Sequence, residues 1–186
     1  MGKINNIGIM EFSSLAAGYQ VEDALLKTAP VTILLARPVC SGKFLIVVSG
    51  SVAAVKASLS GGIRAGGDSI IEYRIINNLH PAVFRALGLS VELGNVLPGA
   101  LGVVETFSAA SAVEAADAAV KNAEITLFRI QLAMAMGGKG LVLFCGALGD
   151  VRAGLDAAIT AMAESGMLAG SALISAPSEE LLREYM

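Results

Sequence analysis

The chain has 186 residues, of which 55% are hydrophobic and 16% are charged, and its formal net charge is −3. This charged share lies below the average of about 25%, so we expect apolar surface that a chain of this size must bury in an obligate oligomer. A chain with a net negative charge gives no sign of the positive surface that nucleic-acid binding requires. The longest uncharged run, residues 165–178, contains glycine and proline and falls short of the about 20 residues of a membrane helix, so we expect a cytoplasmic protein without a membrane partner.

The first half of the chain predicts a small unit of strands and helices. Apolar and β-branched runs bounded by glycine or proline predict strands, and an apolar face with helical spacing predicts helices. Ser51 is a plausible N-cap for the second helix, which should end at Gly66 and Gly67. The expected elements are, in chain order, a strand over 6–12, a helix over 16–28, strands over 31–38 and 43–49, a helix over 51–65 and a strand over 69–76. Helices packed on a mixed sheet indicate an α+β fold.

The second half repeats the first in the same order. At an offset of 94 residues, the stretch 7–11 matches 101–105 and Lys27 matches Lys121. After a two-residue insertion the offset becomes 96 for the rest of the repeat, where Lys43 matches Lys139. We therefore predict two domains, over residues 1–92 and 98–186.

Both halves carry motifs that resemble the bacterial microcompartment shell domain. The motifs of the second half are Gly102-Val103-Val104-Glu105-Thr106, Glu114-Ala115-Ala116-Asp117-Ala118-Ala119-Val120-Lys121 and Gly146-Ala147-Leu148-Gly149-Asp150-Val151. Those of the first half are Glu11, Glu22-Asp23-Ala24-Leu25-Leu26-Lys27 and Gly50-Ser51-Val52-Ala53-Ala54-Val55. Two copies in one chain resemble the tandem-domain class of this family.

The resemblance implies a structural protein and not an enzyme. Two ferredoxin-like domains per chain would form a homotrimer that imitates a hexamer, and cyclic closure would bury the excess apolar surface. Such trimers tile the shell of a cytoplasmic microcompartment together with other shell proteins. A lysine at the end of the first helix lies at the tile edge in this family, which implies this role for Lys27 and Lys121. Their alternative is an ordinary lysine favoured by the helix dipole.

The usual edge arginine near the last strand is missing from both repeats. Asn78 and His80 lie in that region and are candidate edge contacts, with an exposed turn as the alternative for His80. The edge contact should therefore differ from that of the family or be weaker.

In this family the loop between the second and third strands lines the central pore. The residues expected there are Val39, Cys40, Ser41 and Gly42 in the first domain, and Met136, Gly137 and Gly138 in the second, with Ala135 beside them. The segment 37–45 is similar to the pore loop of propanediol-utilisation members of the tandem class, which hold a 4Fe-4S cluster through this cysteine. The resemblance implies one 4Fe-4S cluster per trimer, held by Cys40, for electron transfer across the shell. Cys145, in an apolar strand, is expected in the core.

Two alternatives to the cluster-bearing tile stay open. Cys40 can be a small apolar loop residue, and the tile would then have an open metabolite pore and no cluster. A trimeric ferredoxin-like signalling or ligand-binding protein is the other alternative, and it predicts discrete trimers without sheets.

Two charged residues occupy matching positions in each repeat. Glu11 and Glu105 are expected to accept backbone amides where the chain turns into a helix. Lys43 and Lys139 would raise the positive potential of the pore if they pointed inward.

Overall fold

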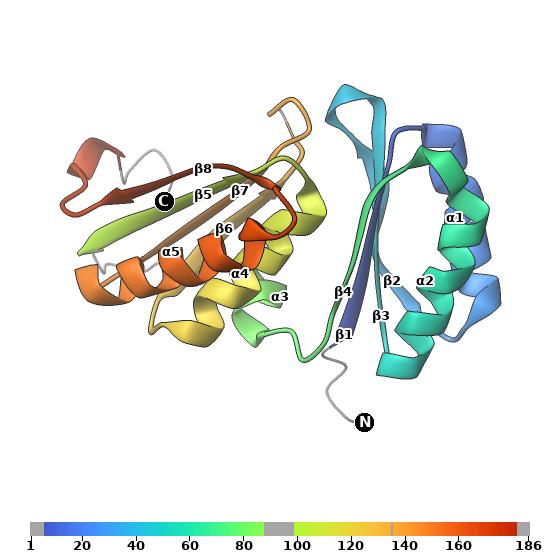
Figure 1. The fold of residues 1–186 in the computed structure, drawn as a ribbon, viewed down its shortest axis with the longest axis horizontal. Helices are drawn as coiled ribbons and strands as arrows, with labels where there is room; N and C mark the ends of the chain where they lie inside the picture. Colours follow the sequence, from blue (N-terminus) through green and yellow to red (C-terminus); the bar gives the residue numbers. More distant parts are fainter. Residues whose placement is uncertain (1–5, 88–98, 135, 182–186) are drawn as a thin grey trace. The chain divides into compact units, whose positions relative to one another are not determined.

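The computed structural model describes residues 6–87, 99–134 and 136–181. The chain divides into two compact units. The first unit comprises residues 1–79 with two short segments, 108–110 and 133–138, and the second comprises the rest. Each unit contains one four-stranded antiparallel sheet with helices packed against it (Figure 1). The domain boundary predicted between residues 92 and 98 lies outside the described residues.

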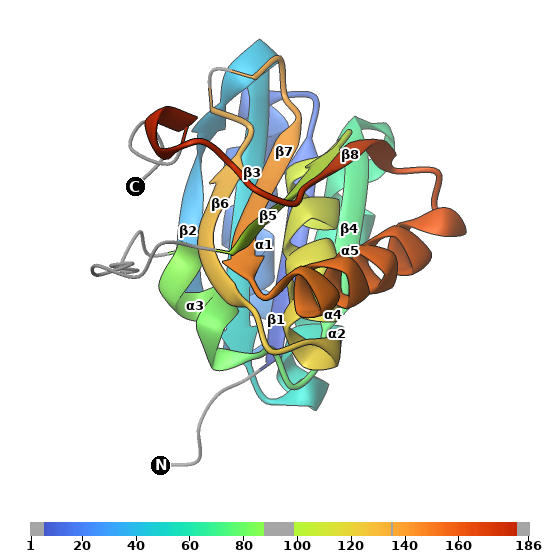
Figure 2. The same cartoon turned by 90° about the vertical axis from the view of Figure 1, so that its left-hand side faces the viewer.

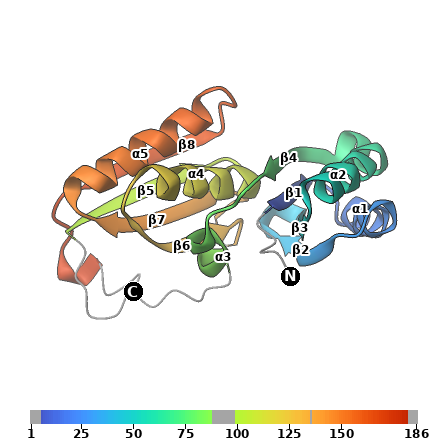
Figure 3. The ribbon, with the colours of Figure 1, turned by 90° about the horizontal axis from the view of Figure 1, so that it is seen from below.

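The first unit has the strand order β2-β3-β1-β4, with every neighbouring pair antiparallel. Its elements are β1 (Asn6–Phe12), α1 (Leu15–Thr28), β2 (Thr32–Val39), β3 (Lys43–Gly50), α2 (Val52–Gly66) and β4 (Ile70–Ile76). The two helices pack side by side against one face of the sheet (Figure 3). This order of elements and strands is the ferredoxin-like arrangement, so the predicted α+β fold is confirmed. The expected mixed sheet is wrong, because β3 lies between β1 and β2 and pairs antiparallel with both.

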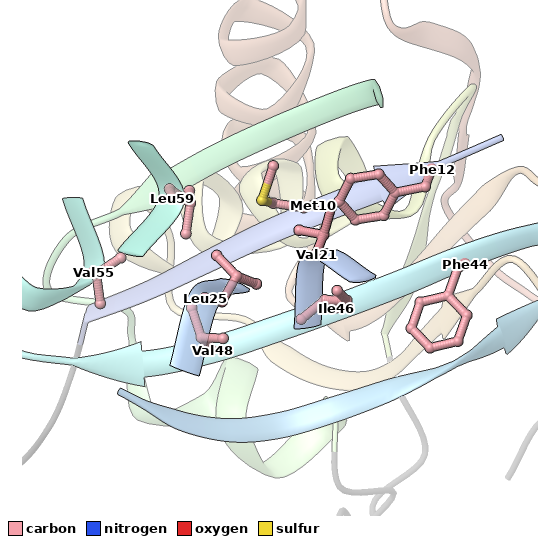
Figure 4. Packing of buried hydrophobic residues seen from close by; sticks show 9 residues of the cluster. All are labelled: Met10, Phe12, Val21, Leu25, Phe44, Ile46, Val48, Val55 and Leu59. Carbon is pink, nitrogen blue, oxygen red and sulfur yellow. The ribbon is translucent and has the colours of Figure 1, made fainter. Parts of the chain in front are cut away.

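The core of the first unit lies between the sheet and these two helices (Figure 4). Its side chains alternate along the strands and recur every four residues along the helices, which places them on one face of each element. They are Met10 and Phe12 from β1, Phe44, Ile46 and Val48 from β3, Val21 and Leu25 from α1, and Val55 and Leu59 from α2. Burying one such side chain contributes about 1.5–3 kcal/mol.

Serine side chains cap both helices of this unit. The Ser14 Oγ accepts the Ala17 N–H at 3.3 Å, and the Ser51 Oγ accepts the Ala54 N–H at 3.2 Å. Each bond satisfies one of the amides that the first helical turn leaves without an intrahelical partner. The predicted N-cap at Ser51 is therefore confirmed.

The second unit repeats this topology with the strand order β6-β7-β5-β8. Its elements are α3 (Pro81–Leu87), β5 (Ala100–Thr106), α4 (Ala109–Asn122), β6 (Thr126–Leu132), β7 (Gly140–Gly146), α5 (Leu148–Ala163) and β8 (Leu168–Ile174). The sequence pattern does not predict α3, which packs beside β6 and begins at a proline, a residue suited to the first helical position (Figure 2). No helix in the described part of the chain is both long and apolar enough to cross a membrane.

The strand register corrects the predicted correspondence between the last strands. Glu11 lies opposite Glu72 in the first sheet, whereas Glu105 lies opposite Gly170 in the second. The offset between these strands is therefore 98 residues, not 96. The difference arises because α5 is one residue longer than α2, and the turn before β8 is also one residue longer.

Candidate functional site

Cys40 lies at the tip of the hairpin formed by β2 and β3, in the 3₁₀ turn Cys40–Gly42. The chain reverses there through left-handed backbone conformations at Ser41 (φ 64°) and Gly42 (φ 70°). Glycine adopts this conformation without a steric penalty, and a Cβ at Gly42 would meet nothing within 4 Å. Cys40 is half-buried, and the two residues after it are exposed. The thiol therefore sits at the base of an exposed tip.

The backbone on both sides of the thiol is anchored. The Cys40 N–H donates to the Ala133 carbonyl oxygen at 2.9 Å, within the first unit. The preceding residue, Val39, is only 7% exposed. These contacts fix the position of Cys40. They also mean that the Cys40 N–H already donates a hydrogen bond within the protein.

The second predicted pore loop follows β6. Met136 is half-buried, Gly137 is exposed and Gly138 is buried, while Ala135 lies outside the described residues. Gly138 has a φ of 87°, and a Cβ there would lie 2.9 Å from the Lys43 Nζ. Glycine is therefore favoured at this position by the backbone conformation, and the end of the Lys43 side chain packs against it. The assignment of both loops to a pore stays a prediction.

Each of the matching lysines forms an ion pair with the matching glutamate of its own repeat. The Lys43 Nζ lies 2.8 Å from the Glu11 Oε1, and the Lys139 Nζ lies 3.0 Å from the Glu105 Oε1. A β-bulge follows the glutamate in both sheets, a feature that redirects side chains. Because a glutamate neutralises each lysine, neither supplies an unpaired positive charge to the loops.

Glu11 also caps a helix, but not the one that the sequence suggests. Its side chain is fully buried, and its Oε2 accepts the Ala109 N–H at 2.9 Å. Ala109 begins α4, whereas α1, the helix that follows Glu11 along the chain, is capped by Ser14. The expectation that this glutamate accepts a backbone amide at a helix start is confirmed, and the expected helix is corrected. The bond is favourable because helix N-termini carry free amides and the positive end of the dipole.

The two cysteines lie in different environments. Cys145 belongs to β7 and is 5% exposed, and burial raises the pKa of its thiol above the ordinary value of 9.0. Metal ligation requires the thiolate, which this burial disfavours. Cys145 is therefore a core residue, as the sequence predicts. Among the described residues, no group of three or more His, Cys, Asp or Glu side chains could hold a metal ion. A cluster at Cys40 would therefore need thiols from several chains.

The two predicted edge lysines also differ. Lys27, in the last turn of α1, pairs with Asp23 at 2.6 Å, and both side chains are largely exposed (74% and 62%). Lys121, in the last turn of α4, pairs with Asp117, which is only 8% exposed. Asp117 Oδ1 also accepts the His80 N–H at 2.8 Å. Lys121 therefore belongs to a local network, whereas Lys27 extends into solvent.

Asn78 and His80 lie between β4 and α3. Asn78 is exposed with a φ of 53°, and its N–H donates to the Asn6 Oδ1 at 3.1 Å. His80 is half-buried, and its Nδ1 accepts the Ala82 N–H at 3.2 Å at the start of α3. His80 is therefore a helix cap and not the exposed turn residue of the sequence-based alternative. The edge role of both residues stays a prediction.

Comparison with known proteins places both repeats in one family. The BMC domain matches residues 6–79 and 100–177. The bacterial microcompartment shell protein PduT of Citrobacter freundii is 36% identical over 182 residues, which cover 97% of each chain. The carboxysome shell protein CcmK2 of Synechococcus elongatus is 31% identical over 78 residues, which cover 40% of this chain and 76% of that protein.

Solved structures extend the similarity to the fold. A microcompartment protein from Desulfitobacterium hafniense is similar with a TM-score of 0.85 and 38% identity, covering 96% of this chain and 98% of that one. The fused permuted hexameric shell protein of the RMM microcompartment is similar with a TM-score of 0.64 and 29% identity, covering 85% and 81%.

These similarities decide the class of protein. BMC shell proteins are structural, and they oligomerise and assemble with other shell proteins. The expected shell location and non-enzymatic role are therefore confirmed, and the shell protein replaces the signalling alternative. The chain belongs to the BMC domain family as a tandem-domain shell protein of bacterial microcompartments, similar to PduT.

Proposed function

We propose that the chain forms a trimeric shell tile in which three Cys40 thiolates hold a 4Fe-4S cluster on the three-fold axis. The two domains, over residues 1–92 and 98–186, repeat one topology, so three chains supply six similar wedges. Closure of such a ring buries apolar surface at each junction. Large apolar side chains exposed on the single chain, and thus available for burial, include those of Leu15, Tyr19, Leu26, Leu34 and Phe107.

The placement of Cys40 is the observation that carries the proposal for a cluster. Its thiol is the soft ligand that iron–sulfur clusters take, and it lies next to an exposed tip without bulky side chains. Three chains supply three thiolates, and a non-protein ligand would complete the fourth iron. When bound, such a cluster supplies one-electron transfer across the shell.

The residues around Cys40 would hold the thiol in place for this role. The bond from the Cys40 amide to Ala133 fixes the backbone at the ligand, and buried Val39 anchors the strand before it. Ser41 and Gly42 turn the chain back at once, which leaves little side-chain bulk beyond the thiol. We propose that these residues, together with the loop 136–138, line the axis.

Iron and sulfide analysis after anaerobic purification tests the cluster. About four irons and four sulfides per trimer and a brown colour are expected, since a cubane cluster contains that number of each. Cys40→Ser should lose the iron, and Cys145→Ala should keep it because that thiol is buried in the core. Iron retained in Cys40→Ser would overturn the assignment. A colourless wild-type trimer that still tiles would instead support the open pore.

Sedimentation tests the trimer independently of the cluster. The expected mass is three times the 18.9 kDa of one chain. A monomer at all concentrations would overturn both the tile and the axial cluster.

The four predicted edge residues complete the proposal. We place Lys27, Lys121, Asn78 and His80 where neighbouring tiles meet. Lys27 is the most accessible of the two lysines and extends from the end of its helix, which suits a contact with another tile. Its removal is therefore the sharper test of the edge.

A further inference from the structure

In the first unit, other residues cover the ion pair of Glu11 and Lys43. Glu11 uses one carboxylate oxygen for the lysine and the other for the Ala109 amide at the start of α4. The Lys43 side chain in turn lies against Gly138, where a Cβ would be 2.9 Å from the Lys43 Nζ. Both partners come from the segments 108–110 and 133–138 of this unit, and the Glu11 side chain is fully buried as a result.

The equivalent ion pair of the second unit is much less covered by the residues that the structure describes. The Glu105 side chain is 39% exposed and that of Lys139 is 41% exposed, against 0% for Glu11 and 18% for Lys43. The residue types, the pairing and the adjacent β-bulge are the same in both sheets. The difference therefore lies in what covers the pair, not in the pair itself.

The first repeat contains the counterparts of the residues that cover Glu11 and Lys43, and these counterparts are exposed. At the offset of 94 residues, Leu15 at the start of α1 corresponds to Ala109; Leu15 is 41% exposed, whereas Ala109 is fully buried. At the offset of 96, exposed Gly42 corresponds to buried Gly138. Neither α1 nor α4 has an acidic residue of its own in the first turn, and α4 receives its carboxylate from Glu11.

We infer that Glu105 and Lys139 bind a second copy of this chain, with Glu105 accepting the amide at Leu15 and Lys139 lying against Gly42. This inference rests on the proposed trimer and assigns the residues that close it. The carboxylate would satisfy a free amide and face the positive end of the α1 dipole. Because donor and acceptor surfaces differ, the contact is heterologous, the type that closes a ring. Since Gly42 belongs to the Cys40 turn, the same contact fixes the position of the thiol.

One difference between the repeats fits this assignment. Ser108 donates to Glu72, whose counterpart by register is Gly170, so the second unit has no carboxylate for an equivalent bond. The counterpart of Ser108 is Ser14, and it caps its own helix instead. Ser14 therefore requires no second carboxylate from the neighbouring copy.

Substitution of Glu105 by glutamine in the full chain tests the inference. Glutamine keeps an oxygen that can accept the amide but removes the negative charge that strengthens the bond, so each subunit contact should weaken about tenfold, or the trimer about 10³-fold since it has three contacts. Sedimentation over a range of concentrations measures this change. The fold should persist, because Glu105 is partly exposed in the single chain, and circular dichroism checks it. The matched control is Glu164→Gln, which removes an exposed carboxylate at the end of α5.

The outcomes separate this inference from the trimer itself. A trimeric wild type with Glu105→Gln as strongly associated as Glu164→Gln would overturn the inference and leave the trimer standing. A monomeric wild type would overturn the trimer as well. Glu11→Gln should instead lower the unfolding midpoint, since its carboxylate is buried within one unit.

Chemical cross-linking gives a second, direct measurement. Leu15→Cys with Gly170→Cys, which lies opposite Glu105 on β8 and leaves that carboxylate in place, should form covalent dimers and trimers with a short bis-maleimide on a denaturing gel in a Cys40→Ser chain. Leu15→Cys with Glu164→Cys should stay monomeric. Equal ladders from both pairs, or a ladder from neither, would contradict the proposed contact.

Discussion

Gly18 in α1 allows the closest packing between a helix and the sheet in the first unit. A Cβ at this position would lie 2.3 Å from the Cγ, 2.5 Å from the Cδ1 and 2.6 Å from the Cβ of Phe44. Ordinary carbon contacts lie at about 3.5–4.0 Å. Phe44 is fully buried and its ring also packs on Tyr19, with the ring centroids 4.8 Å apart. Atoms near the root of a buried side chain cannot move away as a flexible end could.

Gly18→Ala should therefore destabilise the chain. Overpacking costs about 1–3 kcal/mol, and the upper end applies because three atoms at the root of Phe44 are approached. Alanine recovers about 1 kcal/mol of helix propensity, so the net loss should be about 2 kcal/mol. The second repeat supports this reasoning, because buried Ala112 stands at the position of Gly18 and Gly140 at that of Phe44.

Urea unfolding at a fixed protein concentration measures the loss, since oligomer formation makes the midpoint depend on concentration. The control is Gly149→Ala in α5, where a Cβ meets nothing within 4 Å and no loss is expected. In a Phe44→Ala background, which removes the Cγ and Cδ1 atoms that lie closest, the penalty of Gly18→Ala should shrink. A Gly18→Ala chain as stable as wild type would refute the packing argument.

The cysteines and the exposed lysine give three more tests. In the iron-free chain a maleimide should modify Cys40 before Cys145, which is 5% exposed with a raised thiol pKa, and mass spectrometry measures the ratio. The stability contributed by the neutral Cys145 thiol is present below pH 9.0 and lost as pH rises above it, so the difference in unfolding free energy from Cys145→Ala should shrink there. Lys27→Ala should change the unfolding free energy by less than about 0.5 kcal/mol, because its ion pair is exposed. It should nevertheless reduce the sheets seen by electron microscopy relative to Lys56→Ala.

Local patterns in the sequence were sufficient to predict most elements of the fold. Strand alternation, helical spacing and the serine cap at residue 51 predicted every strand and helix of the first repeat with bounds close to those observed. The short helix α3 was missed because a seven-residue helix carries little periodic signal, and His80 and Pro81 read equally well as a turn. The predicted offset of the last strand was wrong because α5 and the turn after it are each one residue longer than in the first repeat, and such insertions do not change the local sequence pattern.

The duplication, the α+β class and the position of Cys40 in a tight turn can be predicted without a structure, because these follow from residue types close together along the chain. The groups that meet across long separations are visible only in the folded chain. Folding pairs each loop lysine with a strand glutamate and gives Glu11 the amide of Ala109, a residue far along the chain. Such contacts depend on strand register and on the ends of packed helices, so neighbouring residues do not encode them.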